Sequence, residues 1–540
     1  MSTVESTGTS PAQHANAMGE ERRKLRKTLR RIDLVFITVA ALVAIDTIAV
    51  TAGIGGGQTL VWLLVLIGVY LIPYGMIVSE LGSAFPYEGG AYVWPRLAFG
   101  RFAGAYTAAF YWMSNPVWVG STVAAVVVAA VNSLIVPDHP VGTWGSIAVG
   151  LGVVVACTVV SWIELRWGKL AGAVGTIVRF LTLGVFLTLV VFFLVRHGKP
   201  AGTVTIGDLK PTVVGFLGVI GLLQFLFVGF ELSNGAAEEM NSPQRDVPKM
   251  ILRSGLIAAL VTGSMILGVL LVVPGDALSK VAGFTDAYAS VASVLGGATH
   301  AFNYFVAALV ILTAISTAAV WQQGTCRVQA VAALDGAAPL WMGKFSGEGT
   351  PVAMNIVSTV IGGAFVVVVF LLAKGSLETF FAITIAVVIS LTAMMYLLIF
   401  PAIIPLRRKY PDRPRPFRVP GGRLGMWLCV IGAESIIVIT TITLLWPGLI
   451  DRLLGQSYDI DSIWGVSRAY FETITLSIVA FFVLVAISFW LWGRRNIARG
   501  LVGENDLLQV ALGAPQGSGD APEVHGAADV PVPNAATDTA

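Results

Sequence analysis

Glu231 is the first residue whose chemistry stands out, because it lies in an apolar stretch, LLQFLFVGFELSNG (222–235), of the kind that crosses a bilayer. A charged side chain at membrane depth is costly, so it usually marks a binding site, a proton relay or an ion path. Asp46 lies in a second such stretch, DLVFITVAALVAIDTIAVTAGIGGGQ (33–58), followed at once by Thr47. At 1.5 Å per residue Asp46 is about 18 Å into its helix. A carboxylate at that depth can hold an ammonium group or carry a proton.

The composition identifies a membrane protein. The chain has 540 residues, of which 56% are hydrophobic and 12% charged, whereas a soluble domain has about 25% charged residues. Apolar runs of spanning length predict an all-α membrane protein with twelve transmembrane helices. The expected spans are 33–57, 60–81, 102–133, 143–162, 171–195, 212–236, 250–273, 300–331, 352–373, 379–405, 424–446 and 470–493.

The distribution of basic residues predicts the topology. Residues 1–32 form a polar tail that ends in ERRKLRKTLRR, and the even-numbered connections are rich in Arg and Lys, most densely at 407–423. Positive charge favours the cytoplasmic side, so we expect a multi-pass plasma-membrane protein with both termini in the cytoplasm. Residues 33–493 would form the twelve-helix domain, and residues 494–540, rich in Ala, Gly, Pro and Asp, a disordered tail.

Two blocks of five spans, 33–195 and 212–405, each begin with a helix that polar residues and glycines interrupt. Because each block has an odd number of spans, the second must enter from the opposite side. This arrangement predicts inverted repeats with a midplane site at the two broken helices, 1 and 6, followed by two further helices in 424–493. The alternative is coincidence, because glycine is common in membrane helices.

The sequence lacks the residue groups that several classes of function require. Cys157, Cys326 and Cys429 are isolated, and the five histidines form no cluster, so we expect no metal and no cofactor. No nucleophile and base set emerges, so an enzyme is not expected. There is no Walker A sequence, which leaves an ion gradient or exchange as the energy source. The expected partners are the lipid bilayer and a small molecule, without nucleic acid, and the oligomeric state stays open.

Four motifs together resemble the amino acid-polyamine-organocation (APC) superfamily of amino acid permeases. They are SELGSAFPYEGGAYVWPRLAFGRFAGAYTAAFYW (79–112), VGFELSNGAAEEMNSPQRDVP (228–248), RVQAVAALDGAAP (327–339) and RPFRVPGG (415–422). The resemblance covers 33 to about 493 and is nearest to the bacterial branch with glutamate/γ-aminobutyrate exchangers. It implies the five-plus-five leucine-transporter-type fold, substrate held between helices 1, 3, 6, 8 and 10, and alternating access.

Physical reasoning supports the same kind of substrate. A broken helix leaves N–H and C=O groups unpaired, and these suit the carboxylate and the ammonium of an amino acid. The residues implied for substrate binding are Asp46, Thr47, Ile48, Phe225, Gly229, Phe230, Glu231 and Trp321. Trp321 matches a relative's substrate-contacting Trp, fifteen residues before the Gly of an Asp-Gly pair, and Phe225 stands where that arginine/agmatine antiporter has another Trp. Both rings could instead serve helix packing.

One stretch departs from the superfamily pattern. Many relatives bend helix 1 with a Gly-Ser-Gly type sequence, but this chain has AIDTIAVT (44–51) there. This difference puts the usual carboxylate pocket in question.

Two residues are expected to decide the energy coupling. Glu231 could carry the coupling proton or, alternatively, bond helix 1 and organise the break. Arg179 approximately matches a helix 5 Lys whose charge replaces bound sodium in sodium-independent relatives, unless it reaches out to the membrane interface. Asp46 could instead pair with a basic residue on helix 5. The prediction is a secondary active transporter of amino acids or related amines, sodium-independent and either proton-coupled or exchanging. The alternative is a membrane amino-acid sensor or channel on the same scaffold.

Overall fold

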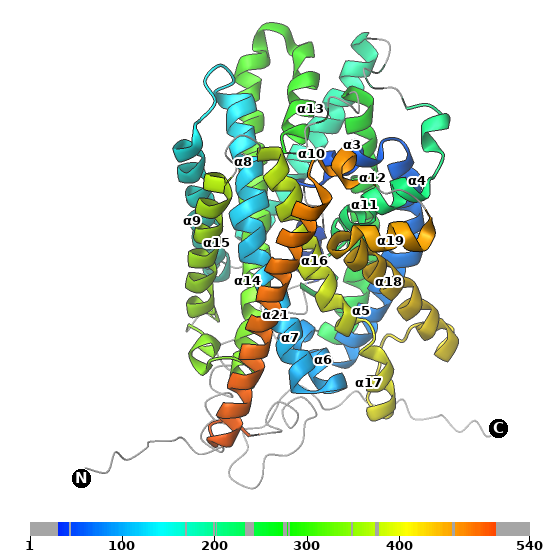
Figure 1. The fold of residues 1–540 in the computed structure, drawn as a ribbon, viewed down its shortest axis with the longest axis vertical. Helices are drawn as coiled ribbons and strands as arrows, with labels where there is room; N and C mark the ends of the chain where they lie inside the picture. The colour runs from blue at the N-terminus through cyan, green and yellow to red at the C-terminus, as the bar shows by residue number, and fades with distance from the viewer. Residues whose placement is uncertain are drawn as a thin grey trace, which may run out of the picture.

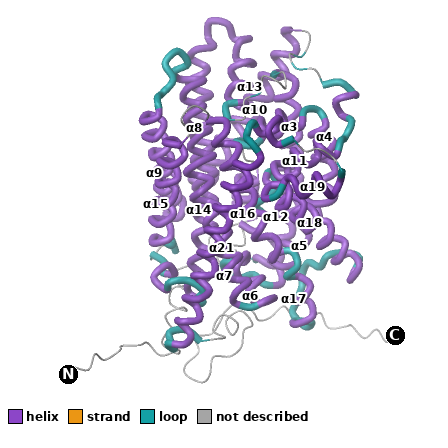
Figure 2. Tube along the Cα trace, viewed as in Figure 1, coloured by secondary structure: helices purple, strands orange, loops and turns teal. Residues whose placement is uncertain are grey.

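The structure is a computed structural model that describes residues 31–42, 45–167, 170–197, 200, 202, 204–232, 242–273, 278, 281–346, 349–372, 377–455 and 459–503. Within these residues every regular element is a helix and no strand occurs (Figure 2). This confirms the all-α fold class. The expected tail at 1–30, the end of the sixth span at 233–236 and residues 504–540 lie outside the described part.

Eleven helical spans of the described residues are long and apolar enough to cross a membrane. They correspond to the second to twelfth expected spans, and the first expected span is divided into two short helices. The inverted repeat stays a prediction. The helices that form the spans are α4 (Gln58–Leu66), α5 (Ile72–Ala84), α7 (Arg101–Trp118), α8 (Ala124–Ala130), α9 (Thr143–Trp167), α10 (Leu170–His197), α11 (Val213–Phe225), α12 (Pro243–Val272), α13 (Gly283–Ala292), α14 (Thr299–Leu334), α15 (Val352–Leu372), α16 (Leu377–Ile399), α17 (Ile403–Lys409), α18 (Gly422–Leu445) and α21 (Arg468–Ala498).

The helices of both predicted spans are interrupted, and the part of the sixth span beyond residue 232 lies outside the described residues. The first helix is divided into α2 (Arg31–Leu42) and α3 (Ile48–Gly55), with Asp46 and Thr47 between them. The helix of the sixth span, α11, ends at Phe225. Gly229 follows with φ 138°, a conformation that favours glycine, and residues 230–232 form one 3-10 turn. The apolar sequence builds the half-helices, and the polar and glycine residues stop them.

The central helices pack around α7, which contacts α14, α16 and α21, while α9 and α15 lie together at one edge (Figure 1). Two π-helical turns interrupt the third span, at Val119–Val123 and Val131–Ile135. Such turns often occur at functional sites. The first of them follows directly on Trp118, the last residue of α7.

Buried ion pairs fix the short helices α6 (Gly90–Phe99) and α17 at one end of the bundle, where Figure 1 shows both: α17 is paired to α5, and α6 to the residue that follows α14. Glu80 at the end of α5 accepts from Arg407 (2.6 Å) and from the backbone N–H of Val419 (2.7 Å). Arg96 pairs with Asp335 at 2.9 Å. Breaking a buried pair is strongly destabilising, so these contacts stabilise the packing at this end of the bundle.

The end of α21 is docked on the loop after α14. Asn496 donates to the carbonyls of Gly336 (3.3 Å) and Ala338 (3.4 Å). Arg101 donates to the carbonyl of Gly503 at 2.9 Å, and Val502 is buried against Gly336. The helix therefore continues past 493, where the disordered tail was expected to begin.

Candidate functional site

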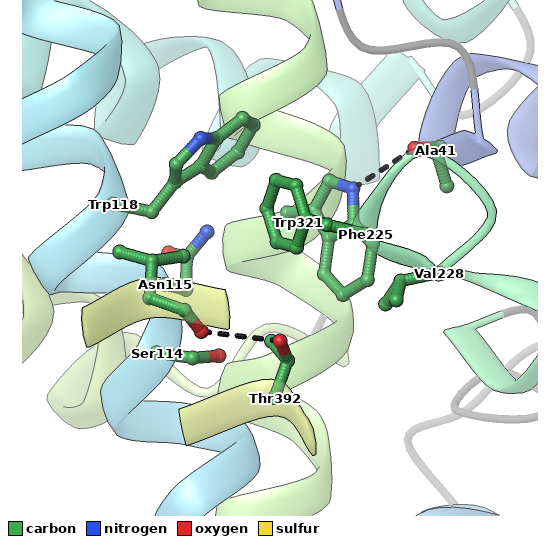
Figure 3. A pocket seen from close by; sticks show the side chains of 9 residues that line it. Ala41, Ser114, Asn115, Trp118, Phe225, Val228, Trp321 and Thr392 are labelled. Carbon is green, nitrogen blue, oxygen red and sulfur yellow. Dashed lines mark hydrogen bonds between the residues drawn. The ribbon is translucent and has the colours of Figure 1, made fainter. Parts of the chain in front are cut away.

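A small cavity lies at the centre of the bundle, between the two broken helices (Figure 3). Its free volume is about 20 Å³, enough for one water molecule. An amino acid therefore needs the surrounding side chains to move apart. The cavity is lined by Ala41 of α2, Ser114, Asn115 and Trp118 of α7, Phe225 and Val228 of the sixth helix, Trp321 of α14, and Val388 and Thr392 of α16.

Aromatic rings form much of the wall. Trp321 donates its indole N–H to the carbonyl of Ala41 at 3.3 Å (Figure 3). This carbonyl belongs to the last turn of α2, where helical carbonyls lack partners. Trp321 also meets Tyr111 edge-on, with ring centroids 6.1 Å apart. The ring therefore joins α14 to the break in the first helix while one face is available to the cavity.

Asn115 is the polar residue of the lining whose side-chain hydrogen-bonding groups are unused. Its side chain is 3% exposed, and neither its Oδ1 nor its Nδ2 has a hydrogen-bond partner in the structure. Leaving such a buried amide unpaired is costly, and native structures rarely do so without a functional reason. Ser114 and Thr392, by contrast, already donate within their own helices, to Tyr111 O (2.8 Å) and Val388 O (3.1 Å). Asn115 can both donate to and accept from a ligand.

Asp46 lies behind one wall of the cavity. Trp118 donates to its Oδ2 at 2.7 Å, and its Oδ1 has no hydrogen-bond partner. Asp46 and Trp118 line a second void of about 10 Å³, together with residues that include Thr317. Trp118 borders both voids, so its ring separates the carboxylate from the central cavity.

Arg179 of α10 is directed at the first helix. Its side chain is buried and donates from Nη1 to the carbonyl of Val39 at 3.3 Å. Its charge also acts on Asp46. The guanidinium therefore does not reach out to the membrane interface. It supplies a positive charge beside the break instead.

Glu231 lies among tyrosines. Its Oε2 accepts a hydrogen bond from the hydroxyl of Tyr74, and that hydroxyl is 2.9 Å from the Tyr396 hydroxyl. The Tyr74 oxygen also accepts from the backbone N–H groups of Gly229 (3.1 Å) and Phe230 (2.9 Å). One phenol thus joins the carboxylate to the unwound backbone of the sixth helix.

The remaining predicted residues lie around the breaks. Phe230 packs on Tyr74, with ring centroids 4.9 Å apart. Thr47 accepts at its carbonyl from the N–H of Thr51 (3.0 Å) and so begins α3, which Ile48 continues. A Cβ at Gly229 would stand 3.3 Å from Trp321 Cζ2 and 3.0 Å from Ala41 Cβ, so this glycine lets the sixth helix approach the cavity wall.

The structure therefore brings together only part of the predicted set. Phe225 and Trp321 line the central cavity, and the other expected residues lie outside its lining. The lining residues that the sequence reasoning missed are Ala41, Ser114, Asn115, Trp118, Val228, Val388 and Thr392. A signal existed for three of them in YWMSNPVW (111–118), where an adjacent Ser and Asn precede a proline inside an apolar span. No group of His, Cys, Asp or Glu among the described residues could hold a metal ion.

A bundle of membrane-spanning helices, two of them interrupted around a buried cavity that holds an unpaired amide, is the architecture of a secondary transporter. The chain belongs to the amino acid permease family, which it matches over residues 29–493. An uncharacterised transporter of Legionella pneumophila is 29% identical over 426 residues, covering 75% of this chain and 86% of the relative. A protein of Lactococcus lactis described as a probable agmatine/putrescine antiporter is 29% identical over 403 residues, covering 72% of this chain and 80% of the relative.

Proposed function

We propose that the protein carries amino acids or closely related amines across the membrane by alternating access, without sodium and in exchange or with protons. The observation that carries the proposal is Asn115, whose amide has no partner inside the central cavity. An amide of this kind offers a donor to a carboxylate and an acceptor to an ammonium group. Family membership supports the same substrate class.

The residues that line the central cavity favour a ligand with an ammonium group. Trp118, Phe225 and Trp321 line the cavity, and a cation beside such rings gains cation–π attraction, which is strongest where water is excluded. No carboxylate is among the lining residues, but Asp46 stands behind Trp118 with one oxygen unpaired. A rotation of Trp118 would expose Asp46 to a second cationic group. A diamine or a basic amino acid has such a group, and the Lactococcus relative is described as an antiporter of two such amines.

Coupling is proposed to run through Glu231 and Tyr74. The Tyr74 oxygen accepts from the N–H groups of Gly229 and Phe230 and is also 2.9 Å from the Tyr396 hydroxyl, so its two lone pairs are fully used. Its single proton goes to the Glu231 carboxylate. A protonated Glu231 no longer needs that donor and would compete for the lone pairs. Proton binding would therefore loosen the break in the sixth helix, next to Phe225.

The test is uptake by purified protein in liposomes, with a panel of α-amino acids, basic amino acids, agmatine, putrescine and γ-aminobutyrate. We expect saturable uptake that unlabelled substrate competes, with Asn115→Ala liposomes as the matched control. Binding without uptake across the panel would favour a sensor instead. Unsaturable flux that no substrate competes would favour a channel.

A further inference from the structure

A long groove runs along the outside of the bundle between α5 and α12. Its volume is about 640 Å³, far larger than the central cavity. On α12 its lining follows one helical face from Arg245 through Lys249, Leu252 and Leu256 to Ala259. These positions recur at spacings of three and four residues, so they form one stripe. At 1.5 Å per residue the stripe is about 21 Å long.

The two ends of the groove differ in chemistry. Arg245 and Lys249 lie one turn apart at one end, are exposed, and take part in no ion pair with any described residue. They are the charged residues of the lining. The rest of the stripe is apolar, with Leu252 76% and Leu256 61% exposed. The basic end is bordered by Pro416 and Phe417, which follow α17, so it lies at the expected cytoplasmic end.

The floor of the groove reaches the break in the sixth helix. Phe230 lines the groove together with Gly75 of α5 and Gly255 of α12. A Cβ at Gly255 would stand 2.9 Å from Phe230 Cζ, and a Cβ at Gly75 would stand 3.5 Å from Phe230 Cε2. The two glycines make room for this ring. An occupant of the groove would therefore touch the residue between Gly229 and Glu231.

We infer that the groove binds one anionic phospholipid of the cytoplasmic leaflet, with its phosphate at Arg245 and Lys249 and an acyl chain along Leu252, Leu256 and Ala259. Two unpaired cations next to an apolar channel complement a phosphate attached to a hydrocarbon chain. The stripe of about 21 Å suits a headgroup and one leaflet, since the whole hydrocarbon core is about 30 Å thick. A free anion would leave the apolar part uncovered, and a neutral lipid would leave the cations unpaired.

The test is lipid retention by the full chain in detergent, followed by native mass spectrometry. The probes are phosphatidylglycerol, phosphatidylcholine, palmitate and inorganic phosphate. We expect phosphatidylglycerol to be retained about thirtyfold over phosphatidylcholine, since each of the two basic residues contributes about 1 kcal/mol of attraction for anionic lipid. Arg245→Gln/Lys249→Gln should lose this preference. Arg408→Gln/Arg423→Gln, which removes two exposed cations outside the groove, should keep it.

A second pair of variants tests the apolar part. Ala259→Trp fills the groove and should lower phosphatidylglycerol retention with both cations present, whereas Leu260→Trp, one residue further on and outside the lining, should not. Thermal unfolding of each variant establishes that it is folded. Equal retention by the Arg245/Lys249 variant and its control would overturn the inference. So would an unchanged Ala259→Trp variant, or inorganic phosphate or palmitate binding as tightly as phosphatidylglycerol.

Discussion

Asn115 holds a donor and an acceptor in the central cavity with no partner for either, so substrate binding is the step that should satisfy them. We predict that Asn115→Ala weakens substrate binding about 10- to 100-fold, because a hydrogen bond to a charged group contributes about 1.5–3 kcal/mol. The variant should fold at least as stably as the wild type, since it removes an unpaired buried amide. Binding to purified protein and thermal unfolding measure the two effects.

Asn355→Ala is the matched control, because Asn355 is also buried with an unpaired amide but lies outside the cavity lining. It should bind substrate like the wild type. If both variants lose substrate binding equally, the prediction that the amide of Asn115 binds the substrate is wrong.

Glu231 is predicted to carry the coupling proton. Glu231→Gln keeps the shape of the side chain and can still accept from Tyr74, but it cannot take up and release a proton. In liposomes we expect loss of proton-driven accumulation with retained substrate exchange at equal pH. Loss of both activities in a folded variant would assign Glu231 to holding the break instead of coupling.

Only some of the residues that form the candidate site could be predicted from the sequence. Charges such as Glu231 and Asp46 stand out because hydrocarbon penalises them, yet the structure places both outside the cavity lining. Neutral Asn115 gives a weaker signal, because amides and hydroxyls occur in many membrane helices. Whether a residue faces the cavity depends on the rotation of its helix. The π-helical turn at Val119–Val123 changes that rotation without any marked sequence signal.

At the scale of elements, the break in the sixth helix depends on Tyr74 of α5. Its hydroxyl is the acceptor for the N–H groups of Gly229 and Phe230. Tyr74→Phe leaves these buried donors unpaired, at about 1–3 kcal/mol each. We predict a clearly lower temperature of thermal unfolding. Tyr70→Phe is the control, because Tyr70 accepts only from the side chain of Gln224 within α11 and should cost less. Equal losses would contradict this role of Tyr74.

Spans and breaks were the most predictable elements. Apolar runs long enough to cross a bilayer have few alternatives to a helix, because backbone groups must be satisfied within the chain. The breaks followed from Asp46, Thr47 and Gly229, which interrupt two such runs. Boundaries were less certain, and α21 continues to Ala498 because Asn496 has partners on the Gly336 loop.

At the scale of the whole molecule, Arg179 fixes a positive charge between α10 and the first helix. A guanidinium keeps its charge at any working pH, so Arg179 places a permanent cation beside the first helix. If this cation takes the place of a bound sodium ion, as we expect, uptake should not change when external sodium is replaced by choline at constant ionic strength. A steep rise in uptake with sodium would contradict the prediction.

The docking of the last described residues bears on how the protein is handled in the laboratory. Since Arg101 binds the Gly503 carbonyl and Val502 covers Gly336, the chain up to 503 belongs to the folded body. A fluorescent reporter or affinity tag joined after this residue leaves the contact intact, whereas one joined at 493 removes it. In detergent, a fusion joined after residue 503 should therefore be more monodisperse on gel filtration than a fusion joined at residue 493.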